Sequence, residues 1–496
     1  MTLPYLTDDC IYYILQYLQN DDSTLFNCLL VNRFWCKSTI PLIYANPFAK
    51  KSKKKYLIIS TLIFCFNKAE ILQLKNQLTI NQINNINIDE EHKPLFEYPK
   101  YLEDYHDFEI NSTIIRYCSG LLISNNKMYD DIIPIFHQSI LRQSRNIKQL
   151  NISSYLFYKE SFKNFNVQNF ISNLTRLNSF SFYLIDTINN EIENEFLRNI
   201  ADISLNLRKL LIKLPQRSYR HDTSNNLINT TTWEKLHKII QGQNKLKIFK
   251  IKNCYSLLNN VLLSLEFQKH SLVHIEFINT DFINVDLKSF NSLYNLEYLM
   301  FESCKGILLN QCEILNCASF KLKTISFKCN IWKVDVTSLI IKYLGASIQR
   351  LFVENPTINL IEDISMYCPN LTFLKLRIHF LIDLISLANN IPINISKISI
   401  SIYYPYSSIK FLKFREFLEN CHDSFEMINL NHIIELRFLK IELNYIERSN
   451  NSLKILGMMN LDKELCDEEL KLLNQIKAKG VKIVEFNSIH DVYKGL

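Results

Sequence analysis

The sequence predicts an α/β solenoid that follows a small helical module. Three observations lead to this prediction: an apolar triplet that recurs along most of the chain, helical periodicity between successive triplets, and three short helix-like segments before residue 48. The 496 residues are 47% hydrophobic and 21% charged, a balance typical of globular rather than disordered chains.

The triplet has the form apolar-x-x-apolar-x-apolar. Its middle positions run from Leu150 to Val484 at a mean spacing of about 28 residues, within the period of roughly 20–29 residues that leucine-rich repeats show. The triplets are Ile147/Leu150/Ile152, Leu177/Phe180/Phe182, Leu207/Leu210/Ile212, Leu246/Phe249/Ile251, Leu272/Ile275/Phe277, Leu296/Leu299/Phe301, Leu322/Ile325/Phe327, Ile348/Leu351/Val353, Leu371/Leu374/Leu376, Ile395/Ile398/Ile400, Phe425/Ile428/Leu430, Leu453/Leu456/Met458 and Val481/Val484/Phe486.

Each triplet predicts a short strand whose two later apolar side chains lie on one face. The connecting segments predict helices, as at 331–347 and 356–369. One such unit cannot bury its own apolar face, so neighbouring units must stack, with parallel strands on the concave face and helices on the convex face. In the last unit, Asp467 suits the start of a helix and Gly480 a left-handed position at its end.

Residues 6–48 predict three short helices. Thr7 is placed to cap the first helix, and Ile11, Ile14, Leu15 and Leu18 form its apolar stripe. A second apolar segment begins at residue 25 and a third at residue 34, and a proline at position 41 is expected to end the series. So many large apolar positions in three short helices favour a module that binds a partner.

This segment resembles an F-box. The family's opening pattern, Leu-Pro-x-Glu, maps onto Leu6-Thr7-Asp8-Asp9, and its closing Val-x-x-x-Trp onto Val31 and Trp35. The chain departs from the pattern at Thr7, where the family has proline. The resemblance implies that the module binds a Skp-type adaptor, and through it a cullin–RING ubiquitin ligase, by the side chains Leu6, Ile11, Ile14, Leu18, Val31 and Trp35. The alternative is that these residues form only a small core.

The repeats resemble the cysteine-containing leucine-rich repeats of F-box proteins, in which a cysteine follows the first leucine by eight positions. Cys254 and Cys304 match that spacing, whereas Thr280, Asn330, Pro356 and His379 replace the cysteine in other units. The predicted organisation is therefore an F-box at 3–48 and a leucine-rich-repeat solenoid of about 13 units at 146–496. Between them, a basic linker and helical connecting or capping region at 49–145 is predicted from its position alone.

Composition excludes several classes of enzyme. The chain has only 7 glycines, and no pair of them forms a dinucleotide-binding turn, a P-loop or a nucleophile elbow. His270 and His274 do not share a helix face in the predicted register, so we expect no metal site there. Cys312 and Cys317 are expected to pack within a repeat. The sequence thus predicts a protein without catalytic residues, metal or cofactor.

The strand positions between the apolar residues are expected to point onto the concave face and to bind a protein substrate. Their mixed charge argues against nucleic acid as the partner. In the central repeats they are Lys250, Lys252, His274, Glu276, Tyr298, Met300, Glu302, Lys328, Arg350, Phe352, Glu354, Phe373, Lys375 and Arg377.

The sequence thus predicts a substrate-recognition adaptor of a Skp–cullin–F-box ligase. The alternatives left open are a repeat scaffold outside any ligase and, less favoured, a nucleic-acid-binding solenoid. The net charge of +7 includes the run Lys50 to Lys55, which is either a solvated linker or a nuclear-import signal. The uncharged stretch 56–66 is too short to span a membrane and predicts a buried helix. No secretory pattern is seen and the 13 cysteines include no C-x-x-C pair, so we expect reduced thiols and a cytoplasmic or nuclear protein.

Overall fold

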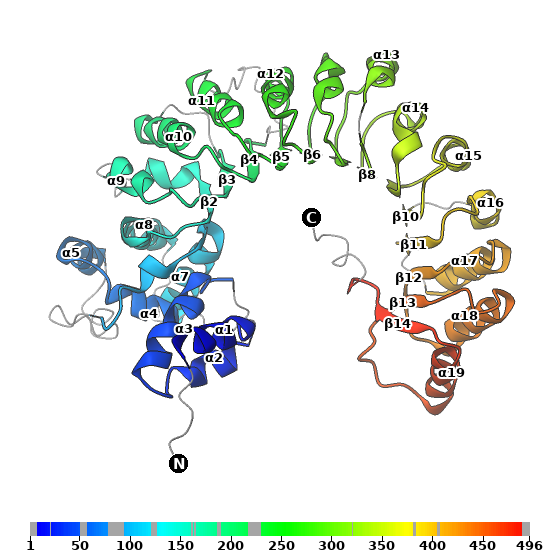
Figure 1. Ribbon diagram of the computed structural model, residues 1–496, viewed down its shortest axis with the longest axis horizontal. Coiled ribbons are helices and arrows are strands. Elements are labelled where there is room, and N and C mark those ends of the chain that lie inside the picture. The colour runs from blue at the N-terminus through cyan, green and yellow to red at the C-terminus, as the bar shows by residue number, and fades with distance from the viewer. Residues whose placement is uncertain are drawn as a thin grey trace. The chain divides into compact units, whose positions relative to one another are not determined.

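The computed structural model describes residues 7–19, 21–49, 57–77, 94–120, 126–159, 162, 165–185, 190–216, 230–319, 321–379, 383–403 and 407–488. Two compact units are present, Met1–Ile248 and Phe249–Leu496. In each unit the strands are parallel, and their order in the sheet follows their order in the sequence. Figure 1 shows that the helices of each unit line one side of its strands. This is an α/β arrangement of the leucine-rich-repeat type.

The first unit begins with helices and continues as repeats. Its helices are α1 (Asp8–Tyr17), α2 (Asp22–Cys28), α3 (Arg33–Ala45), α4 (Leu57–Ile63), α5 (Lys68–Gln77), α7 (Asp107–Gly120), α8 (Asn126–Gln143), α9 (Val167–Ser172), α10 (Glu191–Ile203) and α11 (Thr230–Gln241). Its short 3-10 turns are η1 (Tyr98–Tyr101) and η2 (Ser154–Tyr158). Its strands are β1 (Asp104–His106), β2 (Gln149–Ser153), β3 (Ser179–Tyr183) and β4 (Lys209–Lys213), and β5 (Ile248–Lys252) starts at its last residue.

The second unit repeats a strand and a helical segment. Its strands after β5 are β6 (His274–Ile278), β7 (Tyr298–Glu302), β8 (Thr324–Lys328), β9 (Arg350–Glu354), β10 (Phe373–Ile378), β11 (Lys397–Ile402), β12 (Met427–Ile433), β13 (Ile455–Met459) and β14 (Lys482–Glu485). Its helices are α12 (Leu258–Leu265), α13 (Leu309–Cys312), α14 (Val334–Leu344), α15 (Ile358–Tyr367), α16 (Leu384–Asn390), α17 (Ser407–Asn420), α18 (Leu436–Arg448) and α19 (Asp467–Ala478). The 3-10 turns η4 (Glu266–Gln268), η5 (Leu287–Ser292), η6 (Glu313–Cys317) and η7 (Gly345–Ser347) complete the helical side.

The core of the repeats consists of the predicted triplets. From Leu150 on β2 to Met458 on β13, the two strand positions of each triplet are buried against the helices. The last triplet is out of register by one residue. In the structure Ile483 pairs with Leu456, and Val484 pairs with Gly457 on the opposite face. Because Ile483 and Val484 are adjacent and both apolar, the pattern alone fitted either register.

Residues with positive φ end five consecutive strands of the second unit. The first residue after each of β5 to β9 adopts the left-handed conformation, with φ between 48° and 62°. Its backbone N–H donates a hydrogen bond to the next repeat. For example, Asn279 donates to the Glu302 carbonyl at 2.7 Å, and Ser303 donates to the Lys328 carbonyl at 2.8 Å. None of these positions is a glycine; they are Asn253, Asn279, Ser303, Cys329 and Asn355.

Two sequence expectations about the first unit are wrong. Pro41 does not end the third helix, because α3 continues through it to Ala45, where Ile40 and Ile43 are buried on either side of the proline. The strands also begin earlier than residue 146, since β1 pairs in parallel with β2. Tyr105, at its centre, is buried and its hydroxyl lies 2.6 Å from His137 Nδ1. In contrast, the predicted buried helix in 56–66 is present as α4.

The three N-terminal helices form a small core and are attached to the first strand. The core contains Ile11, Leu15, Leu25, Cys28 and Ile43. At the end of α3, Asn46 Nδ2 donates to Asp104 Oδ2 at 2.8 Å, and the Glu103 N–H donates to the Ala45 carbonyl at 2.8 Å. These bonds fix the helical module on the edge of β1 within the first unit.

Candidate functional site: two interaction surfaces

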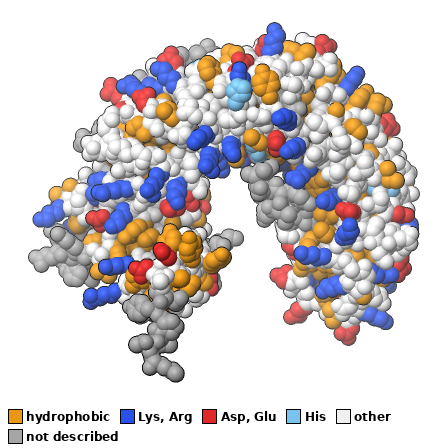
Figure 2. Space-filling model, viewed as in Figure 1, with side chains coloured by type: hydrophobic (Ala, Val, Ile, Leu, Met, Phe, Trp, Pro, Cys, Tyr) orange, Lys and Arg blue, Asp and Glu red, His pale blue; other side chains and the backbone are white. Residues whose placement is uncertain are grey.

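An apolar surface covers the N-terminal helices. Eight large hydrophobic side chains are exposed on α1, α2 and α3 and in the turn before α3, and they include Tyr17 at 90% and Leu30 at 85%. Figure 2 shows hydrophobic side chains gathered over this module. We call this set the apolar face; it consists of Tyr12, Tyr13, Ile14, Tyr17, Phe26, Leu30, Val31 and Phe34.

The local sequence explains why these side chains stay outside. On α1, the positions Ile11 and Leu15 are one turn apart and point into the small core, which leaves Tyr13, Ile14 and Tyr17 on the solvent side. Asn32 caps the N-terminus of α3, and its Oδ1 accepts from the N–H groups of Phe34 and Trp35 at 2.9 and 3.0 Å. That cap holds Leu30 and Val31 in an exposed turn rather than in a helix.

The residues predicted to bind the adaptor fall into three groups. Ile14 and Val31 belong to the apolar face. Leu18 and Trp35 are half-buried against the module's core, and Ile11 is part of that core with 6% of its surface exposed. Leu6 lies outside the described residues. The sequence did not predict the tyrosines and Leu30 as adaptor-binding residues. The spacing of apolar residues along a helix mainly identifies the side chains that face the core, and these four lie on the other side.

The second surface is the face of the strands that points away from the helices, here called the strand face. All the residues predicted for substrate binding lie on β5 to β10 at these positions. Their exposure differs: Lys252 is exposed, whereas Glu276, Met300 and Phe373 are buried by their neighbours. The structure therefore brings these side chains together into one continuous layer rather than leaving each in solvent.

Glu276 is the centre of one polar cluster on the strand face. Its Oε1 accepts from Lys250 Nζ at 2.6 Å and lies 2.7 Å from His274 Nε2. Burial alone would raise the pKa of Glu276, but the hydrogen bonds from His274 and Lys250 prevail and lower it to about 2. The imidazole of His274 stacks on Tyr298 with the ring centres 4.0 Å apart. His274 is thus part of a packed, hydrogen-bonded network.

A second cluster surrounds Glu354. Its Oε2 accepts from the backbone N–H and the Sγ of Cys329, both at 3.0 Å, and its Oε1 lies 2.6 Å from His379 Nε2. Burial and the neighbouring Glu354 raise the pKa of the Cys329 thiol to about 11. A thiol held protonated in this way is a poor nucleophile, so this cluster is structural.

Aromatic rings and cations lie side by side on β9 and β10, next to the Glu354 cluster. Phe352 and Phe373 meet edge to face at 5.7 Å, and Lys375 Nζ lies 5.8 Å from the centre of the Phe352 ring. Arg377 stacks over Tyr403 at 5.2 Å. The glutamates among the predicted residues each pair within the face, and its lysines and arginines outnumber them. The strand face therefore offers aromatic contact area with an excess of positive charge.

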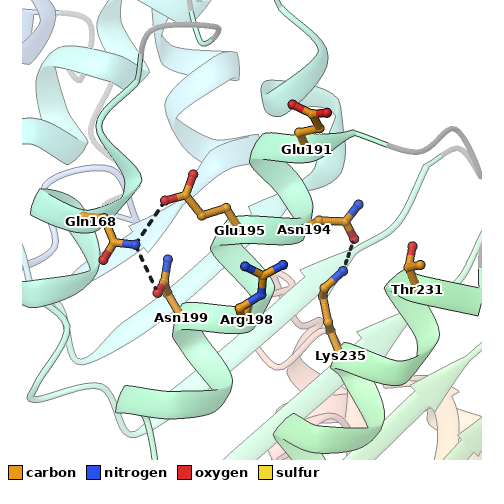
Figure 3. A pocket seen from close by; sticks show the side chains of 8 residues that line it. All are labelled: Gln168, Glu191, Asn194, Glu195, Arg198, Asn199, Thr231 and Lys235. Atoms are coloured by element: carbon orange, nitrogen blue, oxygen red, sulfur yellow. Dashed lines mark hydrogen bonds between the residues drawn. The ribbon is translucent and has the colours of Figure 1, made fainter.

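A polar hollow of about 480 Å³ lies on the helix side of the first unit, between α9, α10 and α11. Figure 3 shows its side chains bonded to one another: Gln168 Nε2 donates to Glu195 at 3.1 Å, and Lys235 Nζ donates to Asn194 at 2.6 Å. Both signs of charge are present, and these bonds link neighbouring helices, while Asn199 Nδ2 is buried without a hydrogen-bond partner. The hollow is a hydrogen-bonded seam between stacked helices.

The described residues contain neither a metal-binding cluster nor a membrane-spanning helix. In the part of the chain that the structure describes, no group of three His, Cys, Asp or Glu side chains is placed to hold a metal ion. Within the same residues, the helices are too short or too polar to cross a bilayer.

Comparisons with known proteins concern the repeats. No family model matches the chain, and no curated protein matches it. Similar solved structures include the TLR13–ssRNA13 complex (15% identity, TM-score 0.36, covering 64% of this chain and 40% of that chain). They also include an internalin from Listeria monocytogenes (12% identity, TM-score 0.28, covering 70% of this chain and 88% of that chain). A further one is the yeast Rad7–Elc1 complex (13% identity, TM-score 0.33, covering 68% of this chain and 90% of that chain). This chain spans less than half of the TLR13 chain. These likenesses concern the solenoid fold and say nothing of function.

Proposed function

We propose that the chain is a substrate-recognition adaptor of a Skp–cullin–F-box ubiquitin ligase and has no catalytic residues of its own. The observation that carries the proposal is the apolar face on α1 to α3, on a module whose sequence resembles an F-box. A soluble chain rarely exposes so many aromatic and aliphatic side chains side by side unless they bind a partner. Its tyrosines, beside a half-buried tryptophan, are of the residue types enriched among the anchors of protein interfaces.

The partner assigned to the apolar face is a Skp-type adaptor. The contact residues are the exposed Ile14 and Val31, joined by Tyr13, Tyr17 and Leu30. Ile11 and Leu15 act indirectly, because they hold α1 against α3. The adaptor would connect the module to the cullin and the RING subunit.

The strand face is assigned to the protein substrate. Its aromatic pair Phe352 and Phe373 gives contact area, and Lys375 and Arg377 supply the excess positive charge. That charge favours a substrate segment rich in acidic residues. The adaptor then works by position, since holding a substrate lysine near a charged ubiquitin carrier raises its effective concentration.

Capture of a Skp adaptor by the full chain tests this function. Coexpression with the wild-type chain is expected to give a stable complex. Leu30→Asp and Val31→Asp should each lower capture by at least ~10-fold, because a charge buried in an apolar interface costs more than 1.4 kcal/mol. Leu72→Asp on α5 is the matched control, since Leu72 is an exposed leucine outside the module, and it should capture as wild type does.

Two results would contradict the proposal. One is a folded wild-type chain that captures no Skp adaptor. The other is equal capture by Leu30→Asp, Val31→Asp and Leu72→Asp. The first would leave the alternative of a repeat scaffold that works outside a ligase, and the second would show that the adaptor does not bind through the apolar face. Circular dichroism of each purified variant separates loss of binding from loss of folding.

A further inference from the structure

A row of main-chain positions runs along the edge of the first unit at which its strands begin. Its members are Glu103, Lys148, Asn178, Arg208 and Lys247. The backbone N–H of each member donates to the carbonyl of the member before it, at 2.7–2.9 Å. Neighbouring members are therefore one strand spacing apart, about 4.8 Å. The second unit has the same row, in which Lys323 follows Glu297 and Lys454 follows Glu426.

In the described residues, each lysine that directly follows a glutamate in this row forms an ion pair with it. The pairs are Lys148 with Glu103 at 2.7 Å, Lys323 with Glu297 at 2.8 Å and Lys454 with Glu426 at 3.0 Å. A carboxylate one strand spacing away is thus the partner that a cation takes at this edge of the repeats.

Arg208 and Lys247 have no glutamate beside them in the row. The three segments that lead into β3, β4 and β5 contain five cations and no acidic residue. We call these cations the basic ridge; it consists of Arg176, Arg208, Lys209, Lys245 and Lys247, in the segments 176–179, 206–209 and 245–248. Within the described part of the chain, the exposed side chains of Arg208, Lys245 and Lys247 form neither a hydrogen bond nor an ion pair.

Helix ends at this edge explain only part of the excess charge. α9, α10 and α11 each end shortly before the strand that follows, so the negative ends of their dipoles favour cations there. Each helix C-terminus amounts to about half a negative charge, or about 1.5 charges for the three helices, against five positive charges. In the second unit η6 and α18 end in the same way before β8 and β13, yet Lys323 and Lys454 come with glutamates. The surplus of positive charge is therefore particular to the first unit.

We propose that the basic ridge binds an acidic segment of a partner protein. From β3 to β5 the ridge covers two strand spacings, about 10 Å, which three or four residues of extended chain can follow. Consecutive aspartates or glutamates in such a segment supply the carboxylates that the row lacks here. The three segments of the ridge hold no aromatic side chain on which the bases of a single-stranded nucleic acid would stack.

Binding of this kind depends on several weak contacts acting together. Arg176, Arg208, Lys245 and Lys247 are exposed, so each contact with a carboxylate is screened by water and salt. A cluster of like charges nevertheless attracts an acidic segment over a distance and raises the association rate. The basic ridge is separate from the apolar face and from the substrate residues proposed on β5 to β10, so the inference does not depend on the ligase role.

Titration of the full chain with a labelled acidic peptide tests the inference. The probe is a fluorescein-labelled peptide with six consecutive glutamates, and the control peptide has six glutamines instead. Saturable binding of the acidic peptide is expected at about 50 mM salt. It should weaken at least ~10-fold at about 300 mM salt, because the screening length falls to less than about half. The glutamine peptide should not bind.

Charge reversal locates the site. Arg208→Glu combined with Lys247→Glu should weaken binding of the acidic peptide at least ~10-fold, because two attractive contacts become repulsive. Lys440→Glu combined with Lys471→Glu is the matched control, with the same change in net charge. In the described structure these two lysines are exposed on α18 and α19 and form no ion pair. The control should bind within ~3-fold of wild type, because distant surface charges are screened, and circular dichroism verifies that both variants fold.

Four results would overturn the proposal. One is a folded wild-type chain without saturable binding, and another is equal weakening in the two double variants, which would trace binding to net charge alone. A third is weakening by Lys375→Glu combined with Arg377→Glu but not by reversal in the ridge, which would place the acidic segment on the strand face. The fourth is tighter binding of an oligothymidylate with the same number of charges, which would assign the ridge to nucleic acid.

Discussion

At the residue scale, the chain uses asparagine, serine and cysteine where a glycine would be the easiest choice. The left-handed conformation after β5 to β9 costs an ordinary L-residue about 1–2 kcal/mol, and this free-energy cost is smaller for asparagine than for most other residues. This conformation is stabilised because the N–H group of the turn residue donates a hydrogen bond to the next repeat. The chain has few glycines, so these turns are made by other residues, chiefly asparagine.

Ser303 tests that cost, because its φ is 54° and serine is less suited than asparagine to the left-handed conformation. Ser303→Gly should raise the unfolding midpoint, with a gain of up to ~1 kcal/mol. Ser303→Val should lose ~1–2 kcal/mol, since a β-branched side chain tolerates positive φ poorly. Thermal melts of the three proteins measure both; a glycine variant less stable than the valine variant would contradict the explanation.

Glu193 on α10 supplies a pH-dependent prediction. Burial raises the pKa of this carboxyl to about 7, and hydrogen bonds from Tyr158 and Thr232 offset only part of the effect. Because the pKa is raised in the folded state, the protonated carboxyl contributes its full stability at pH values below the pKa of the unfolded chain, near 4.5. That contribution is lost as the pH rises through 7, the pKa in the folded state. Glu193→Gln removes this dependence.

The measurement is urea unfolding of wild type and Glu193→Gln at several pH values. The variant should gain stability relative to wild type as the pH rises from 4.5 to 7. Glu191→Gln, at an exposed position of the same helix, is the control. A stability difference that stays constant over this window would show that Glu193 titrates alike in both states.

At the element scale, the repeat strands were predictable because two physical requirements coincide in them. A strand position such as Phe249 or Ile400 must be apolar to face the helices, and the next unit repeats that need at a similar spacing. The prediction failed at β14, where Ile483 and Val484 satisfy either register, and at β1, which has only Tyr105 as a buried centre. Short strands carry too few side chains to show a period.

The candidate surfaces were less predictable than the strands. Apolar spacing on α1 points to both Ile11 and Ile14, yet tertiary packing turns the first into the core and leaves the second exposed. Tyr17 is the most exposed of these side chains, and no periodicity marks it. On the strand face, the sequence predicted which residue types are present. It could not predict the pairing of Glu354 with Cys329 and His379, because the three residues belong to three successive repeats.

Pro41 offers a test at the scale of one helix. It stands inside α3, where it lacks the N–H that would bond to the Lys37 carbonyl and crowds that oxygen. Pro41→Ala should therefore stabilise the module by ~1–2 kcal/mol, since part of the gain is lost to a more flexible unfolded chain. Slower amide exchange in α3, with unchanged exchange in α19, is the expected readout. Faster exchange would mean that the proline is needed for the packing of Ile40 and Ile43.

At the scale of the whole molecule, each repeat contacts mainly the repeats before and after it. The strands pair in sequence order within each unit, and neighbouring helices such as α14 and α15 or α16 and α17 pack side by side. Stability in such arrays is a sum of unit and interface terms, so a local defect spreads only to its neighbours. The N-terminal module and the second unit should therefore respond independently to damage.

Ile400→Ala tests this independence. Ile400 is buried at the centre of β11, where its removal leaves a cavity and costs ~2–5 kcal/mol. Amide exchange should accelerate in β10, β11 and β12, whose ladders include that strand, and remain as in wild type in α1 to α3. Skp-adaptor capture should also be unchanged, because the apolar face lies outside the damaged repeats. If exchange rose throughout the chain, the molecule would unfold as one cooperative body, and a loss of binding at the strand face could not be separated from a loss of binding at the apolar face.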